Sequence, residues 1–260
     1  MKIFKKAITV LTLSTLGLTF TASAGPIVTA WDWVVDNAFT AFAPPTNANP
    51  ALGVLGINDN TYWSAPTTLI WGNNASSLAL GGVNGNTSGT NLANGALTQT
   101  TSLTHNNFVI NGASLTSATL STRLLLDPNP GVLPFDITPP ALTYDISFLE
   151  TNNDGSCEVV SPIPCNDIFV IDGSDFSQPF IYDGNMYNVE LLISGLGMLS
   201  NTACTAAGAA EGCLGFTTVE NASNTFAVNM RITAVPEPST ILLLSLAMFG
   251  IVMSVRSKRV

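Results

Sequence analysis

The chain has 260 residues, of which 46% are hydrophobic and only 10% are charged, and its formal net charge is −9 at pH 7. Between residues 25 and 235 two basic residues, Arg123 and Arg231, stand against sixteen Asp and Glu residues, so this segment has a net charge of −14. A segment this acidic repels phosphate backbones, which argues against nucleic acid as a partner.

The first 24 residues have the three parts of a secretory signal peptide. Three lysines precede an apolar stretch over residues 8–20, and an Ala-Ser-Ala sequence that ends at Ala24 matches the small-residue cleavage rule. We predict cleavage after Ala24 and export of the remaining chain. An uncleaved N-terminal anchor is the alternative, and the shortness of the apolar stretch disfavours it.

The segment after the signal peptide is predicted to be all-β. Short runs rich in β-branched and aromatic residues alternate with Gly, Asn, Pro and Asp, and no long stretch has an apolar period of 3.6 residues. Strands are predicted at 27–39, 67–72, 102–110, 118–126, 142–151, 167–172, 180–194 (with a turn at Asp183-Gly184) and 225–234. Residues 43–50 are predicted to be a turn-rich break, and residues 81–95 a loop or a meander rich in Gly and Asn. The pattern favours one β-sandwich domain, jelly-roll-like in topology.

Four cysteines, at Cys157, Cys165, Cys204 and Cys213, follow the signal peptide. An even number of cysteines in an exported chain predicts disulfides. Of the three possible connectivities we favour the two local ones, Cys157–Cys165 and Cys204–Cys213, because each pair brackets a loop that contains glycine or proline. A zinc site is the alternative, but these spacings are wider than the two to four residues that usually separate paired cysteine ligands.

Candidate chemistry is sparse. His105 is the only histidine, and it is either a ligand or acid–base group or a structural residue with hydrogen-bonded ring nitrogens. Acidic residues beside glycines offer oxygen ligands for calcium, although none fits a known calcium loop and such sequences also form plain turns. These residues are Asp154, Asp167, Asp172, Asp175 and Asp183.

Four tryptophans lie in the first third of the chain, at Trp31, Trp33, Trp63 and Trp71. Exposed indole rings stack on sugars, so they raise the possibility of a carbohydrate-binding module. Packing in the core is the commoner fate of tryptophan and is the alternative.

The C-terminal tail combines three features. Pro236, Glu237 and Pro238 precede an uncharged apolar run over residues 241–255, and a basic cluster follows at Arg256, Lys258 and Arg259. The tail resembles the PEP-CTERM sorting signal of Gram-negative bacteria. This resemblance implies recognition by an exosortase, a transmembrane helix that enters the inner membrane transiently, and delivery to the cell surface or the exopolysaccharide matrix.

A second resemblance lies within the body. Thr104, His105 and Asn107, in the sequence Leu-Thr-His-Asn-Asn, are similar to the signature of the THxN family of PEP-CTERM proteins. Trp71-Gly72, followed by the Ser-Ser-Leu sequence at 76–78, is similar to a segment upstream of that signature, with a shorter linker. The resemblance implies no biochemical activity for these residues.

Taken together, the sequence predicts a signal peptide at 1–24, a secreted β-sandwich at 25–235 and a sorting signal at 236–260. The predicted role is structural or adhesive, in a biofilm or extracellular polymer, and not enzymatic. Exosortase and exopolysaccharide are the predicted partners, and no cofactor or metal is predicted apart from the calcium alternative. A carbohydrate-binding module and a secreted hydrolase that uses paired carboxylates are the alternatives.

Overall fold

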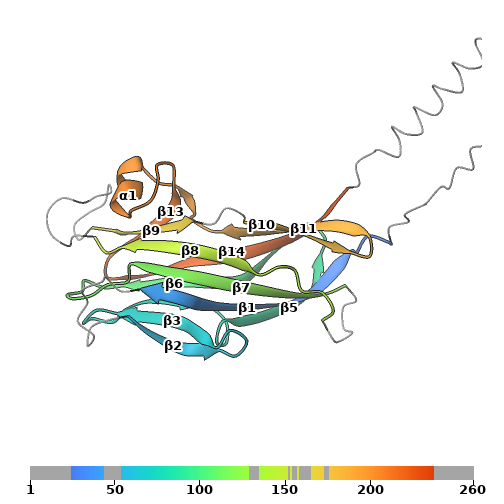
Figure 1. Cartoon of the computed structure of the whole chain (residues 1–260), viewed down its shortest axis with the longest axis horizontal. Helices are drawn as coiled ribbons and strands as arrows, with labels where there is room; N and C mark the ends of the chain where they lie inside the picture. The colour runs from blue at the N-terminus through green and yellow to red at the C-terminus, as the bar shows by residue number, and fades with distance from the viewer. Residues whose placement is uncertain are drawn as a thin grey trace, which may run out of the picture.

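The computed structural model describes residues 25–43, 54–128, 135–151, 153, 157, 165–172 and 176–236. This part of the chain forms two antiparallel seven-stranded sheets that pack as a β-sandwich (Figure 1). Within it, no helix is both long enough and apolar enough to cross a bilayer. The predicted signal peptide, Ala24, Glu237, Pro238, the C-terminal transmembrane helix and its basic cluster lie outside the described residues.

The first sheet has the strand order β12 (Gly197–Met198), β13 (Leu214–Thr218), β9 (Asp167–Asp172), β8 (Leu142–Leu149), β7 (Ser117–Asp127), β1 (Ala30–Ala43) and β5 (Asn86–Ala93). The second has the order β10 (Ser177–Tyr182), β11 (Asn185–Ile193), β14 (Ala222–Val235), β6 (Leu97–Asn107), β4 (Ser76–Leu80), β3 (Ala65–Trp71) and β2 (Leu55–Asn60). A short helix, α1 (Asn201–Ala206), precedes β13.

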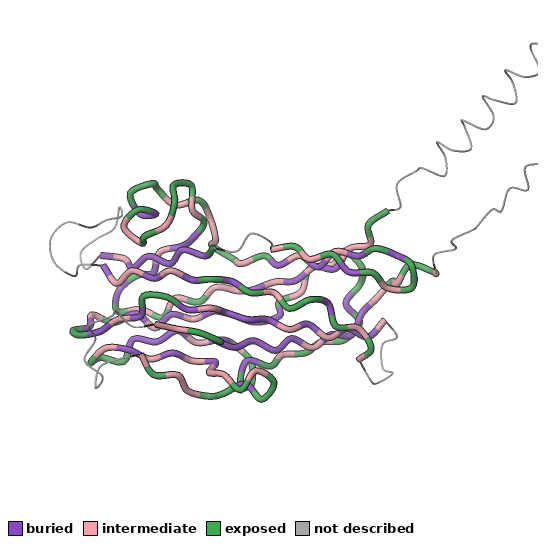
Figure 2. Tube along the Cα trace, in the orientation of Figure 1, coloured by how far each residue is buried: buried purple, intermediate pink, exposed green. Residues whose placement is uncertain are grey.

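Alternating apolar side chains fill the space between the sheets, as the period of two residues in the sequence predicts. On β8, Tyr144, Ile146 and Phe148 are buried, and on β14, Met230 and Ile232 are buried. Buried residues alternate with less buried ones along β8 and β11, whereas β1 and β9 are buried along most of their length (Figure 2). Each fully buried large apolar side chain contributes about 1.5–3 kcal/mol relative to exposure, so this layer is the main source of stability.

Of the two alternatives for residues 81–95, the loop is wrong for residues 86–93. Residues 86–93 form β5, which pairs with β1 at the edge of the first sheet. Its composition resembles that of a loop because most of its side chains are exposed and because Gly89 packs against the indole ring of Trp33. A Cβ at position 89 would lie 2.6 Å from that ring. Strands β2, β4, β12 and β13 and helix α1 were not predicted.

Both predicted disulfides are present. Cys157 is bonded to Cys165, and Cys204 is bonded to Cys213. The second bond joins α1 to the residue before β13. The first closes the connection between β8 and β9, which becomes important for the site described below.

The two ends of the sandwich differ. The Gly25 N–H donates to the carbonyl of Asp183 at 2.8 Å, and β14 ends at Val235 beside Met186, so both termini of the described body lie at one end, here called the tail end (Figure 1). At the other end, here called the far end, β14 begins beside Asn107. The 14 residues of β14 separate the two ends by roughly 45 Å.

Candidate functional site

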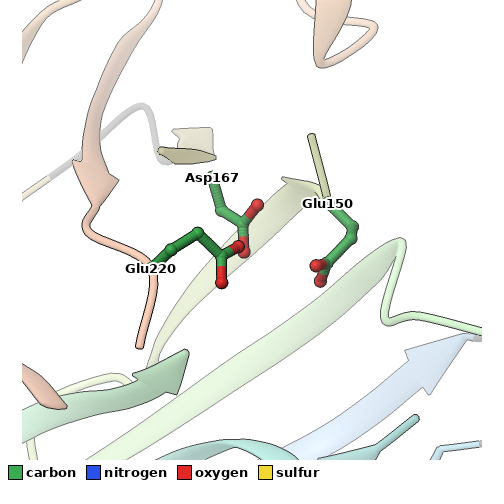
Figure 3. Close-up of side chains that lie close together, drawn as sticks. All are labelled: Glu150, Asp167 and Glu220. Carbon is green, nitrogen blue, oxygen red and sulfur yellow. The ribbon is translucent and has the colours of Figure 1, made fainter. Parts of the chain in front are cut away.

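Three acidic side chains from different elements meet at the far end of the sandwich. Glu150 follows β8, Asp167 begins β9, and Glu220 lies in the turn between β13 and β14 (Figure 3). One carboxylate oxygen from each lies within 4.8 Å of the other two. In this carboxylate cluster, Asp167 is 0% exposed and Glu220 is 7% exposed, and Glu150 is half-buried, although both of its carboxylate oxygens are buried.

Strand pairing places Glu150 next to Asp167. Leu149 of β8 pairs with Ile168 of β9, so the residues that follow and precede them, Glu150 and Asp167, are neighbours across the ladder. Thr151 fixes the carboxylate, because its backbone N–H donates to Asp167 Oδ1 at 2.9 Å and its hydroxyl donates to the carbonyl of Cys165 at 3.0 Å. The disulfide to Cys157 therefore constrains the segment that carries Asp167.

A tight connection between the sheets places Glu220. Residues 219–221 lead from β13 in the first sheet to β14 in the second. The side chain of Asn224 both accepts from the N–H of Val219 and donates to its carbonyl, each at 3.0 Å. Asn221 has a left-handed backbone with φ of 54°, a conformation that asparagine tolerates better than most residues. The turn is thus held in a shape that buries Glu220.

Burial makes the charged form of each cluster residue unfavourable. Burial raises the pKa of Glu150 to about 9, and the nearby charges of Asp167 and Glu220 add to the effect. Burial also raises the pKa of Asp167 to about 8, although its hydrogen bonds from Thr151 act in the opposite direction. The pKa of Glu220 is raised as well, again by burial.

Among the described residues, no basic side chain neutralises the cluster. Arg123 is bound to Asp36 and Arg231 to Glu190, and the sequence has no other Lys or Arg between residues 25 and 235. Both oxygens of Glu150, both of Glu220 and Oδ2 of Asp167 accept no hydrogen bond from the described part of the chain. The Trp71 indole approaches Glu150 and lowers its pKa somewhat, but without hydrogen-bond geometry.

Two of the three residues of the THxN-like sequence, His105 and Asn107, are hydrogen-bonded to a residue beside this cluster. His105 Nδ1 is hydrogen-bonded to the hydroxyl of Thr218 at 2.9 Å, and the Asn107 amide donates to the carbonyl of Thr218 at 3.2 Å. Thr218 pairs with Asp167 and lies two residues before Glu220. Thr104 points the other way, and its hydroxyl is hydrogen-bonded to that of Thr225 on the outer face of the second sheet.

His105 is held among aromatic rings. Its ring stacks on Trp71 at 5.5 Å and meets the edge of Phe169 at 4.9 Å, and it is 0% exposed. Burial lowers its pKa to about 3, so the ring is neutral at physiological pH. These contacts support the structural alternative for His105, as a positioning residue that joins the second sheet to the first.

The tryptophan-glycine segment packs against the same region. Gly72 has φ of 70°, and a Cβ there would lie 2.7 Å from Ile110, so the close approach requires glycine. The hydroxyl of Ser76 accepts from the N–H of Phe108 at 3.1 Å. The two segments that resemble one family signature are therefore neighbours in space.

Sequence reasoning found only one member of the cluster. Of the five acidic-turn candidates, Asp167 belongs to it, whereas Asp172 is exposed at the end of β9 and Asp183 lies at the tail end. Asp154 and Asp175 lie outside the described residues. Glu150 and Glu220 were missed because 70 residues of sequence separate them and only sheet pairing joins them.

Three of the four tryptophans are core residues and do not form a sugar-binding face. Trp31, Trp33 and Trp71 are 0%, 5% and 1% exposed. Trp63 is half-buried, and its indole N–H donates to the carbonyl of Asp36 at 3.1 Å. Packing in the core, the alternative to sugar stacking, therefore holds for the three buried rings.

The raised pKa values of the cluster predict how the stability of the fold depends on pH when a chelator removes divalent ions. Glu150 and Asp167 hold protons more tightly in the folded chain than in the unfolded chain, so their contribution to stability is complete below an unfolded pKa near 4 and is lost as pH rises toward 8 and 9. His105, whose folded pKa is lowered, acts oppositely but only below 6.5.

Between pH 6.5 and 8 we therefore expect the free energy of unfolding in EGTA to fall by roughly 1–2 kcal/mol. Urea denaturation at several pH values measures this fall. The double variant Glu150→Gln/Asp167→Asn should give a flat profile over the same range. An equally steep profile in that variant would show that other groups are responsible.

Residues 234–259 match the model of the PEP-CTERM protein-sorting motif. The match begins within β14 and covers the tail, and it leaves the rest of the sandwich unassigned. No curated protein matches the chain significantly. The motif marks an exported bacterial protein that an exosortase handles and that reaches the cell surface or the exterior.

Proposed function

We propose that the chain is a structural or adhesive protein of the surface or exopolysaccharide matrix of a Gram-negative bacterium. The observation that carries the proposal is how the sandwich joins the sorting motif. Strand β14 ends at Val235, and the next residue, Pro236, is exposed at the tail end. The body is thus folded up to the residue before the Pro-Glu-Pro sequence, and the first residue of that sequence, Pro236, is exposed where a membrane enzyme would bind.

The chemistry of the tail supports transient anchoring. Prolines at 236 and 238 prevent a helix from continuing upstream of the apolar run. That run, residues 241–255, is shorter than the ~20 residues that span a bilayer comfortably. The basic residues after it favour a cytoplasmic end, while the signal peptide at 1–24 exports residues 25–235. A short span is adequate if it only holds the protein until cleavage.

The body supports a structural role rather than catalysis. Paired carboxylates that hydrolyse sugars flank an open cleft at separations of about 5–10 Å. The carboxylate cluster is buried, and its nearest oxygens lie within 4.8 Å of one another. A carbohydrate-binding role would need a surface other than the buried tryptophans. Membership of the THxN family is part of this proposal and rests on the contact between its two signature segments.

Replacing Glu237 by alanine tests the sorting route. The variant should keep its tail and accumulate in the inner-membrane fraction, because the acidic residue between the prolines is the distinctive group of the motif. Cell fractionation and the mass of the recovered protein measure this. Glu211→Ala, at an exposed position in the body, is the matched control and should be sorted normally. Normal sorting and processing of Glu237→Ala would contradict the proposal.

A further inference from the structure

We propose that Glu150, Asp167 and Glu220, together with the side-chain oxygen of Asn107, bind one divalent cation at the far end of the sandwich, and that the ion is calcium. This proposal does not depend on the sorting route. It assigns a ligand to the carboxylate cluster, and it explains why neighbouring residues hold the cluster in place.

The geometry of the three carboxylates suits a single ion. Calcium–oxygen distances are about 2.3–2.6 Å, so two ligands of one ion lie at most roughly 5 Å apart. The three cluster oxygens lie within 4.8 Å of one another, and Figure 3 shows the carboxylates of Asp167 and Glu220 side by side with that of Glu150 facing them. One ion can contact all three with little rearrangement.

Asn107 provides an independent observation. It is 0% exposed, and its Nδ2 donates to the carbonyl of Thr218, while its Oδ1 accepts no hydrogen bond from the described residues. The same side chain lies against both Asp167 and Glu220. A buried carbonyl oxygen without a partner costs about 1–3 kcal/mol. A cation beside the carboxylates would provide that partner.

The negative charge of the three carboxylates must be balanced by protons or an ion from solution. Both arginines of the body are paired elsewhere, and the connection over residues 152–164, part of which is not described, contains no basic residue in its sequence. Three carboxylates that face one another in a buried site need positive charge or protons. Protons would also neutralise them, and a carboxyl O–H could donate to the amide oxygen of Asn107, so calcium titration decides between the two.

The ligand types favour calcium. All four side chains offer oxygen, which hard cations prefer, whereas zinc and copper prefer histidine and cysteine. The four cysteines are paired in disulfides, and the group of ligand atoms that meet within 4.8 Å consists of Glu150, Asp167 and Glu220 and does not include His105. Magnesium needs a near-ideal octahedron, whereas calcium accepts irregular sites built from loops. Glu150 and Glu220 lie in such irregular segments.

A bound ion would join the two sheets. Asp167 belongs to the first sheet and Glu150 directly follows one of its strands, Asn107 ends a strand of the second, and Glu220 lies in the turn that connects the two sheets. Calcium would therefore fasten the sandwich at the end opposite the sorting tail. Because this arrangement exists only in the folded chain, binding stabilises it.

Calcium titration of the full chain, kept in mild detergent and first stripped with EGTA, tests the proposal. We expect one ion per chain with a Kd of about 0.1–1 mM, the range of extracellular modules, and a rise in the thermal unfolding midpoint. Terbium luminescence excited through tryptophan should appear and should be displaced by calcium, because Trp71 lies beside Glu150. Magnesium should bind more weakly.

Three variants locate the site. Glu220→Gln and Asp167→Asn should weaken calcium binding by roughly tenfold or more, since each removes a charged ligand. Both should fold, because each also removes repulsion, and in EGTA their unfolding midpoints should equal or exceed that of the natural chain. Glu211→Gln, an exposed control, should bind calcium normally.

Each outcome is decisive. Absence of a calcium-dependent shift in the folded natural chain would overturn the proposal and leave a cluster that shares protons. Full binding by Glu220→Gln and Asp167→Asn would overturn the location. Tighter binding of magnesium than of calcium would overturn the choice of ion.

Discussion

Replacing Trp31 by alanine is expected to lower the free energy of unfolding by about 3–5 kcal/mol, because the change opens a large cavity between the sheets. Trp31 lies on β1 and is 0% exposed. Its ring makes edge contacts with Phe180 at 5.8 Å and Tyr187 at 5.1 Å, on β10 and β11 of the opposite sheet. The loss therefore weakens the contact between the two layers.

Urea denaturation of Trp31→Ala and Trp63→Ala separates a core role from a sugar-binding role. Trp63 is half-buried, so its replacement should cost only about 1 kcal/mol for one hydrogen bond and partial packing. If Trp31→Ala were as stable as the natural chain but lost affinity for a polysaccharide, the ring would be a binding surface and the assignment of the core would be wrong.

Replacing Arg123 by leucine is the second change with a large expected effect, about 3 kcal/mol of destabilisation. Asp36 is 5% exposed, and its carboxylate accepts from Arg123 and, at 2.7 Å, from Asn86. The guanidinium also covers the ring of Tyr62 at 3.3 Å. Without Arg123 the buried carboxylate loses its only charged donor among the described residues.

Arg231→Leu is the matched control, because it removes the only other arginine of the body. The side chains of Arg231 and Glu190 are 40% and 35% exposed, so their ion pair is screened by water. We expect a loss below about 1 kcal/mol. Equal losses for the two variants, measured by chemical denaturation, would show that burial does not distinguish these ion pairs.

The sequence predicted those features that depend on local pattern. Alternation of apolar residues located the core faces of β8 and β14, and cysteine spacing located both disulfides. Strand β5 was missed because its side chains are mostly exposed and its glycine lies under Trp33, so the segment has the composition of a loop. Backbone pairing with β1, which side-chain composition does not encode, makes it a strand.

The carboxylate cluster shows more clearly what local sequence patterns do not predict. Asp167 could be singled out from the sequence, but Glu150 and Glu220 could not, because each is an isolated acidic residue beside a strand end. Their meeting depends on the β8–β9 register and on the crossing from β13 to β14. The resemblance that drew attention to His105 and Asn107 located the neighbourhood but assigned it no chemistry. The structure connects these residues to the acidic cluster through Thr218.

The central claim is that the chain is exported and then sorted by cleavage of its tail. The intact mass of the protein recovered from the bacterial surface or medium tests this claim most directly. The account predicts a chain that begins at Gly25, contains the two disulfides and has lost the apolar run and the basic cluster. Recovery of a surface protein that still contains residues 241–260 would contradict it.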